Sequence, residues 1–322
     1  MAPPTALVAD IGGTNARFAI ADLDTLTLTH FAAFPCARFS SPAAAIAAYL
    51  ATTTERPPRA TFAIAAPVAG DRVQLTNLAW TITCEDVRTA TGAEDVLLLN
   101  DFEALARSLP LLDDRDLRQV GGQAPVPHAT KAVLGPGTGL GVAGLAWSPA
   151  GWMPVAGEGG HVTFPAQTSE ELAIVERLRS GTSSVSMERL LSGPGLGMLH
   201  AILSDRAEPP LPAPAVTARA LAGTDPAARK ALDLFVAWLG RFAGDLALVY
   251  GARGGVYLGG GIAPRIVDVL AAGPFRAAFE DKGRLRPYVA SIPVYVITAP
   301  DAGLRGAAVT LAADAQAVDR LS

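Results

Sequence analysis

The chain has 322 residues, of which 50% are hydrophobic and 17% are charged, with a formal net charge of −4. This composition supports one large or two medium domains with a sizeable core, and it excludes a disordered chain. The acidic balance and the lack of basic runs argue against nucleic acid and anionic membrane surfaces as partners. Cys36 and Cys84 are the only cysteines, which excludes a disulfide framework or a cysteine-rich zinc cluster and fits a reducing compartment.

The sequence gives no indication of secretion or membrane insertion. Residues 1–5 lack a basic region ahead of an apolar stretch, so no signal peptide is expected. The most apolar late segment, residues 231–250, is interrupted by Asp233, Arg241 and Asp245, which predicts a buried or interface helix. We therefore expect a cytoplasmic protein with no membrane partner.

The apolar patterns of the first third predict strands and helices in mixed order. Strands are expected at residues 6–11, 16–23, 27–34, 61–66 and 95–99, and helices at 42–53, after 83 and at 102–109. Thr83, with Asp86 three residues later, predicts a capping box in which Asp replaces the usual Glu.

After a loop-like stretch at residues 111–130, rich in Pro, Gly and charges, strands and helices alternate again. A strand pair is expected at residues 131–147, and a proline-rich loop at 209–214. Further strands are predicted at 255–258 and 293–298, and further helices after 168 and at 226–250, 263–270 and 303–321. This alternation predicts the α/β class, with the chain leaving its first lobe within residues 111–130.

Two glycine turns of similar design are the most informative feature of the chain. Asp10-Ile11-Gly12-Gly13-Thr14 follows one apolar strand, and Gly135 to Gly141 follows another; aligning Gly13-Thr14 with Gly137-Thr138 gives an offset of 124 residues. Glycine allows close backbone approach to a ligand, and successive N–H groups bind anions. One copy would suit an ordinary hairpin, but two copies favour phosphate binding by two related lobes with a cleft between them. Asp10 can hold Mg²⁺ through water.

Neither turn matches the commoner phosphate motifs. No Gly-Lys-Ser/Thr follows, so the turn is not a P-loop. The element after each turn is a strand, whereas a dinucleotide fingerprint requires a helix.

Asn100-Asp101 follows a predicted buried strand, where α/β proteins present reactive groups. An amide and a carboxylate side by side can bind neighbouring hydroxyls, and the carboxylate can accept a hydroxyl proton. Asp101 would also cap the helix that begins at Phe102. From this segment alone, capping and catalysis are equally supported.

Three further segments carry candidate ligand-binding groups. In Gly157-Glu158-Gly159-Gly160-His161, a carboxylate and an imidazole separated by glycines can contact one small ligand, although a plain surface loop is the alternative. Glu188 at a helix start would ordinarily serve the helix dipole. Gly259-Gly260-Gly261 suits either a nucleoside contact or a tight connection.

In these motifs the chain resembles the bacterial glucokinases, sugar kinases of the actin–hexokinase fold. The resemblance also includes Glu188 to Gly195, residues 259–265 and residues 275–283, so it spans nearly the whole chain in order. It implies a two-lobed α/β fold of duplicated mixed sheets with a central cleft. The expected small lobe is residues 1–112, completed by the helix at about 303–322, and the large lobe is residues 113–302.

The resemblance implies ATP- and Mg²⁺-dependent phosphorylation of D-glucose at O6 by a cytoplasmic homodimer. Asp101 would be the general base, and Asn100, Asp101, Glu158, His161 and Glu188 would bind the sugar. The nucleotide would contact Ala9, Asp10, Ile11, Gly12, Gly13, Thr14, Gly137, Thr138, Gly259, Gly260 and Gly261, with Asp10 serving Mg²⁺.

Two departures and three alternatives accompany this expectation. Pro136 lies in the second turn, where a small residue with an N–H is expected, and the cysteine-rich zinc motif of the related ROK kinases is missing. A kinase for another hexose or an N-acetylhexosamine is the nearest alternative. A sugar-sensing repressor is disfavoured because only nine residues precede Asp10, too few for a DNA-binding module. An actin-like ATPase would have no use for Asn100-Asp101 or for Glu158 and His161.

Overall fold

The structure is a computed structural model that describes residues 4–75, 78–179, 184–205 and 209–319. The chain divides into two compact units. The first comprises residues 1–116, 150–156 and 299–322, and the second comprises residues 117–149 and 157–298. Within the described ranges, no helix is both long enough and apolar enough to cross a bilayer.

The first unit is built around a five-stranded sheet in the order β3-β2-β1-β4-β7. The strands of this sheet are β1 (Thr5–Ile11), β2 (Asn15–Asp22), β3 (Leu28–Pro35), β4 (Arg59–Ile64) and β7 (Asp95–Asn100). A separate two-stranded sheet consists of β5 (Arg72–Gln74) and β6 (Thr81–Thr83). Its helices are α1 (Pro42–Leu50), α2 (Cys84–Thr91), α3 (Asp101–Ser108) and α12 (Ala302–Asp319), with 3₁₀ turns at Cys36–Arg38 and Leu109–Leu111.

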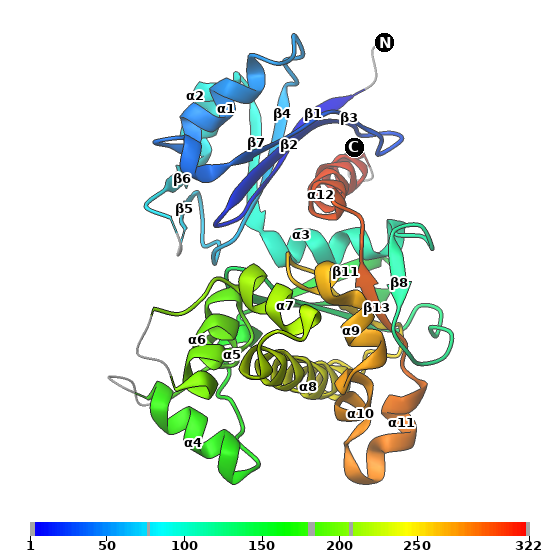
Figure 1. The fold of residues 1–322 in the computed structure, drawn as a ribbon. Coiled ribbons are helices and arrows are strands. Elements are labelled where there is room, and N and C mark those ends of the chain that lie inside the picture. Colours follow the sequence, from blue (N-terminus) through cyan, green and yellow to red (C-terminus); the bar gives the residue numbers. More distant parts are fainter. Residues whose placement is uncertain (1–3, 76–77, 180–183, 206–208, 320–322) are drawn as a thin grey trace. The chain divides into compact units, whose positions relative to one another are not determined.

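Alternation along the strands divides the apolar residues between the two faces of this sheet. On β1, Leu7 and Ile11 belong to a cluster that includes residues of α1 and α2, whereas Ala6 and Val8 pack with α12. Figure 1 shows α12 on the opposite side of the sheet from α1 and α2. Since Asp10 shares the parity of Val8, its carboxylate lies on the α12 face.

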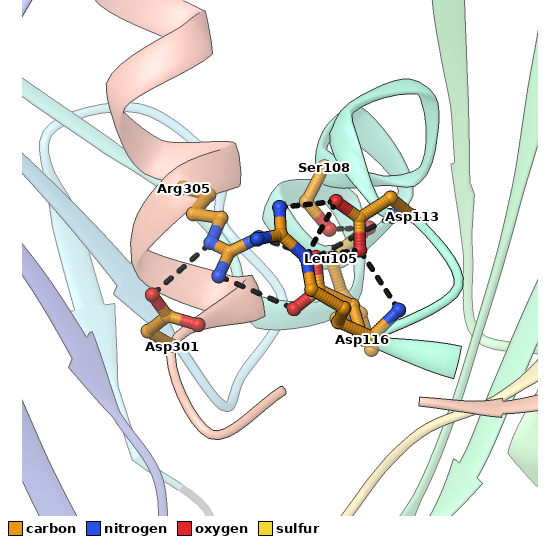
Figure 2. A network of polar contacts seen from close by, with 7 residues as sticks. Leu105, Ser108, Asp113, Asp116, Asp301 and Arg305 are labelled. Carbon is orange, nitrogen blue, oxygen red and sulfur yellow. Dashed lines mark hydrogen bonds and ion pairs between the residues drawn. The ribbon is translucent and has the colours of Figure 1, made fainter. Parts of the chain in front are cut away.

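A polar network fixes the start of α12 (Figure 2). Arg305 donates to Asp301 at 3.0 Å and to Asp116 at 2.7 Å. Asp116 is the last residue of the first segment of this unit, and its carbonyl also accepts from the N–H of Ala299, the first residue of the returning segment. One guanidinium therefore joins the place where the chain first leaves this unit to the place where it finally re-enters it.

A second sheet has six strands in the order β11-β10-β9-β12-β13-β8. These are β8 (Leu117–Gln119), β9 (Lys131–Pro136), β10 (Leu140–Ser148), β11 (Gly151–Gly157), β12 (Val256–Leu258) and β13 (Val294–Ile297). The helices of the second unit are α4 (Ser169–Leu178), α5 (Met187–Leu190), α6 (Gly193–Ser204), α7 (Ala213–Ala222), α8 (Pro226–Val249), α9 (Val267–Ala272), α10 (Phe275–Glu280) and α11 (Arg286–Ser291). Its 3₁₀ turns are Gly159–His161, Ala263–Ile266 and Gly283–Leu285.

The helix α8 forms the centre of the second unit's core. Phe235, Trp238 and Phe242 on α8 are buried in a cluster that also contains residues of β9, β12 and β13. The side chain of Glu171 is only 5% exposed, and it accepts hydrogen bonds from Trp238 Nε1 at 2.7 Å and from Arg241. A buried carboxylate is thereby paired and hydrogen-bonded, as burial of a charge requires.

Most of the predicted elements are confirmed, with three differences in the second unit. The stretch at 111–130, predicted as a loop, contains the short strand β8. The predicted helix at 263–270 consists of a 3₁₀ turn, Ala263–Ile266, followed by α9. The predicted loop at 209–214 already enters α7 at Ala213, because Pro214 lies in the first turn of that helix, where the missing N–H has no cost.

Candidate active site

The carboxyl ends of three parallel strands bring two of the predicted motifs to one edge of the first sheet. Ile11 on β1 is paired with Ile64 on β4, and Ile64 is paired with Asn100 on β7. The turn that follows β1 and the Asn100-Asp101 pair that follows β7 therefore leave the sheet at the same edge. This is the edge at which open α/β sheets bind ligands.

The first glycine turn is closed by its own backbone and is flanked by an ion pair. Gly12 N–H donates to the carbonyl of Asn15 at 2.9 Å. Asp10 Oδ2 accepts from Arg17 at 3.0 Å, and a Cβ at Gly303 on α12 would lie 3.1 Å from the same oxygen. Burial raises the pKa of Asp10, although the Arg17 guanidinium acts in the opposite direction. Arg17 is a partner of Asp10 that the sequence motif did not reveal.

At the end of β7, the two side chains have different tasks. Asn100 is the N-cap of α3: its Oδ1 accepts from the N–H groups of Phe102 and Glu103. Its amide nitrogen donates to the carbonyl of Ala66 at 3.1 Å. Asp101 is the first residue of the helix and accepts from Phe102 N–H at 3.0 Å. The prediction that Asp101 caps the helix was wrong: Asn100, the last residue of β7, occupies the cap, and the helix begins at Asp101, one residue earlier than expected.

The second glycine turn repeats the first with a different offset from the one expected. Ile11 and Pro136 end the first strands, and Asn15 and Leu140 begin the second strands, so equivalent positions are 125 residues apart. The carbonyls of Ile11 and Pro136 also accept equivalent bonds, from Ala65 N–H and Ile262 N–H. Pro136 therefore corresponds to Ile11 at a strand end and lies before the turn itself.

The structural equivalent of Gly12 is Gly137, and both N–H groups are used inside their turns. Gly137 N–H donates to the carbonyl of Gly139 at 2.8 Å, as Gly12 N–H does to that of Asn15. These two donors hold the turns closed. Any backbone donor for a bound anion would therefore come from the other turn residues, among which Thr138 is exposed.

The Gly259–Gly261 loop packs directly on the second turn. It follows β12, which pairs in parallel with β9, and Gly259 N–H donates to the carbonyl of Leu134 at 2.8 Å. Gly260 has φ +76°, and a Cβ there would lie 2.5 Å from the carbonyl oxygen of Pro136. This position therefore requires glycine both for its backbone conformation and for the close approach.

Glu158 and His161 also border the second turn. Glu158 Oε2 lies 4.0 Å from His161 Nε2, and the side chains are 54% and 58% exposed. Gly160 between them packs so closely on Leu140 that a Cβ would lie 1.9 Å from its carbonyl oxygen. The glycines thus bring an exposed carboxylate and imidazole beside the turn.

Glu188 lies in the first turn of α5, which Ser186 caps. Its Oε2 accepts from the backbone N–H of Leu140 at 2.8 Å. Gly193 N–H, five residues later, donates to the carbonyl of Gly137 at 2.8 Å. The expected dipole role of Glu188 is therefore accompanied by a direct bond to the second turn, for which the local sequence gives no signal.

The predicted site residues thus form two groups, each brought together within its own unit. The first group is the turn after β1 with Asn100 and Asp101. The second is the turn after β9 with Glu158, His161, Glu188 and the Gly259–Gly261 loop. Both groups combine backbone amides at a turn with hydrogen-bonding carboxylates, the donor and acceptor types suited to phosphates and sugar hydroxyls.

Comparisons with known proteins agree with this arrangement over nearly the whole chain. The Glucokinase family model matches residues 7–314. A glucokinase from Neisseria gonorrhoeae is 48% identical over 309 residues, which cover 95% of this chain and 94% of the relative. A glucokinase from Chromobacterium violaceum is 47% identical over 315 residues, which cover 95% and 89%.

Solved structures extend the likeness to the fold. The crystal structure of a glucokinase from an Antarctic psychrotroph has a TM-score of 0.80 and 35% identity, and covers 96% of this chain and 98% of its own. A ROK family glucokinase from Streptomyces griseus, in complex with glucose and AMPPNP, has a TM-score of 0.67 and 20% identity, covering 94% and 98%. The expected α/β fold and the resemblance are confirmed, and the chain belongs to the glucokinase family.

Proposed function

We propose that this chain transfers the γ-phosphoryl group of ATP to O6 of D-glucose. One observation carries the proposal. This chain belongs to the glucokinase family, and its Asp101 lies at the carboxyl edge of the parallel strands β1, β4 and β7. An acceptor hydroxyl needs a carboxylate for its proton, and the other elements of phosphoryl transfer are positioning and charge stabilisation.

On the sugar side, Asp101 is the general base. It accepts the proton of the 6-hydroxyl as the oxygen attacks the γ-phosphorus, while the bond to the β–γ bridging oxygen breaks. Asn100, Glu158, His161 and Glu188 bind the remaining hydroxyls, together with Asp101. Because an epimer misplaces one hydroxyl and leaves the carboxylate or amide that binds it without its partner, the set supplies selectivity for glucose.

On the nucleotide side, the two turns bind the phosphates and the Gly259–Gly261 loop lies against the nucleoside. The contributing residues are Ala9, Asp10, Ile11, Gly12, Gly13, Thr14, Gly137, Thr138, Gly259, Gly260 and Gly261. Gly12 and Gly137 contribute by holding the turns closed, because their own N–H groups are already used. The S. griseus relative, whose structure contains AMPPNP, supports ATP as the donor.

The residues present also fit Mg²⁺. Only one oxygen of Asp10 is bonded to Arg17, and a carboxylate oxygen is the kind of ligand that Mg²⁺ takes directly or through water. When bound, Mg²⁺ would neutralise charge on the phosphates. Burial raises the pKa of Asp10, and the Arg17 guanidinium opposes that effect by favouring the ionised form that Mg²⁺ would need.

The test is ATP consumption with and without glucose, followed by identification of the phosphorylated position. Asp101→Ala should lower kcat by about 10²- to 10⁴-fold while glucose binding stays measurable, as expected for loss of a general base. Glu103→Gln is the matched control, because Glu103 lies on the same helix and is paired with Arg107 at 2.9 Å. Near-normal turnover of the Asp101 variant would remove that residue from the base role.

A substrate panel with coupled detection of ADP distinguishes glucose from the alternatives. Greater kcat/KM with another hexose or an N-acetylhexosamine would replace glucose as the substrate. Sugar-independent ATP hydrolysis would favour an ATPase. A homodimer in the cytoplasm also belongs to the proposal, and the mass in solution tests the dimer.

A further inference from the structure

We propose that Glu188 is a positioning residue for the second glycine turn, and that it couples hexose binding to nucleotide binding. The inference rests on the proposed function for the ligands and on the structure for the contact. Glu188 Oε2 accepts from Leu140 N–H at 2.8 Å, although 48 residues separate the two in the chain. Leu140 begins β10, directly after the turn of residues 137–139.

The segment that contains Glu188 holds the turn at both of its ends. Glu188 binds the N–H that follows the turn, and Gly193 N–H donates to the carbonyl of Gly137, which begins it. Thr138 lies between these two anchored positions and is exposed. The conformation of the turn is therefore set partly by a carboxylate and partly by its own internal bond.

The turn leaves room for this carboxylate by lacking a side chain. A Cβ at Gly139 would lie 2.4 Å from Glu188 Oε2, and Gly139 does not have a positive φ. Alanine can adopt the backbone conformation at this position, but its methyl group would occupy the place of the carboxylate oxygen. Because a glutamate side chain can move away, Gly139→Ala should break the bond to Leu140 without unfolding the turn.

The hydrogen bond between Glu188 and Leu140 is strong enough to couple sugar binding to nucleotide binding. A hydrogen bond from a backbone N–H to an ionised carboxylate is roughly twice as strong as a neutral one. A sugar hydroxyl bound to the same carboxylate fixes its rotamer, and so lowers the entropy cost of ordering the turn when phosphate binds. By linkage, a bound nucleotide must favour the sugar by the same factor.

The experiment measures AMPPNP binding by calorimetry with and without saturating glucose, together with both KM values. In the wild-type protein, glucose should tighten AMPPNP binding by about fivefold or more, the usual range of coupling between two sites. Glu188→Ala and Gly139→Ala should each reduce that factor to near one and raise the KM for ATP. Glu188→Gln should restore part of the coupling, because its amide oxygen can still accept from Leu140 N–H.

Two comparisons separate positioning from a plain structural effect. In the double variant Glu188→Ala/Gly139→Ala, the loss of coupling should be no greater than in either single variant, since both remove one contact. Glu176→Gln, an exposed residue of α4 paired with Arg179, should leave coupling and both KM values unchanged. Thermal unfolding of each variant identifies any that fails to fold.

Three results would overturn the inference. These are wild-type AMPPNP affinity that glucose leaves unchanged, a Glu188→Ala variant that raises only the KM for glucose, or a Gly139→Ala variant that couples normally. All three leave glucose phosphorylation standing. Conversely, a wild-type protein that phosphorylates no sugar would reject the proposed function. In that case, weaker AMPPNP binding by Glu188→Ala than by the wild-type protein, measured without sugar, would still support the positioning role.

Discussion

The Glu171 network provides the sharpest test of how the second unit is stabilised. Glu171 accepts from the N–H of Gln167 at 2.6 Å, from Trp238 Nε1 at 2.7 Å and from the Arg241 guanidinium. The side chains of Glu171 and Arg241 are 5% and 16% exposed. Glu171→Ala would leave a buried cation and an indole N–H without their acceptor, and we expect a loss of about 3–5 kcal/mol.

The loss should be visible in thermal unfolding followed by circular dichroism. For a unit of this size, about 1 kcal/mol corresponds to roughly 2–4 °C, so the midpoint should fall by about 10 °C. Glu171→Gln should also destabilise the protein, because every partner of the carboxylate is a donor and the amide NH₂ would face one of them. Glu176→Gln on the same helix is the control, since its exposed pair with Arg179 should change stability by less than about 0.5 kcal/mol.

The pH dependence adds a second check. Burial alone would raise the pKa of Glu171, but the hydrogen bonds from Arg241, Gln167 and Trp238 outweigh it and hold the pKa below the ordinary value. The ionised group therefore contributes stability above the pKa of the unfolded chain, about 4.3, and loses that contribution as pH falls through the lower folded value. The gap between the wild-type protein and Glu171→Gln should shrink toward pH 3. A gap below 0.5 kcal/mol at pH 7, or one unchanged at pH 3, would refute the reasoning.

Three further substitutions test other parts of the fold. Gly306→Ala should destabilise the first unit by about 1–3 kcal/mol in urea unfolding. The new Cβ would lie 1.7 Å from the carbonyl oxygen of Ala104, so α12 must shift away from α3. A gain in stability, which is usual when alanine replaces glycine inside a helix, would contradict this. Arg305→Met should lower the stability by about 2–3 kcal/mol in the same assay, because it leaves the carboxylates of Asp116 and Asp301 unpaired. An Arg305→Lys variant as stable as the wild-type protein would show that contact with both carboxylates is unimportant. Asp225→Ala should remove the N-cap of α8 and lower the stability by about 1 kcal/mol at pH 7. The Ala228 N–H and then His200 hold the pKa of Asp225 below its ordinary value, so the difference in stability between the wild-type protein and the variant should disappear as pH falls below about 4. A difference that stays constant with pH would argue against an ionised cap.

Local signals in the sequence predicted the elements that positioned most of the site. The strand pairs around both glycine turns are confirmed, as is the capping box of Thr83 and Asp86. Each of these depends on residues within a few positions of one another, so alternation and capping patterns suffice to find them.

The parts that the sequence did not predict depend on contacts between distant residues. The offset of 124 came from matching Gly-Thr with Gly-Thr, whereas the strand ends set it at 125. The bond from Glu188 to Leu140 spans 48 residues, and nothing near Glu188 indicates it. The cap of α3 is Asn100 and not Asp101, and the Asn100 side chain is held by its bond to the carbonyl of Ala66, which lies 34 residues earlier in the chain.

The packing of α12 on the first sheet has a consequence for synthesis. Leu304 and Leu311 cover Ala6 and Val8, so the part of this face over β1 and β2 has no cover until the end of the chain is made, whereas α3 already packs on Ala63 and Leu99 of β4 and β7. Between the end of β7 and the start of α12 lie about 200 residues, or roughly 10–40 s of translation. The surface that α12 will cover is rich in alanine, whereas the face already covered by α1 and α2 contains bulky residues such as Phe18. The nascent protein thus exposes the less hydrophobic surface over β1 and β2 to the ribosome and chaperones, and a stop codon shortly before residue 302 would leave that surface uncovered.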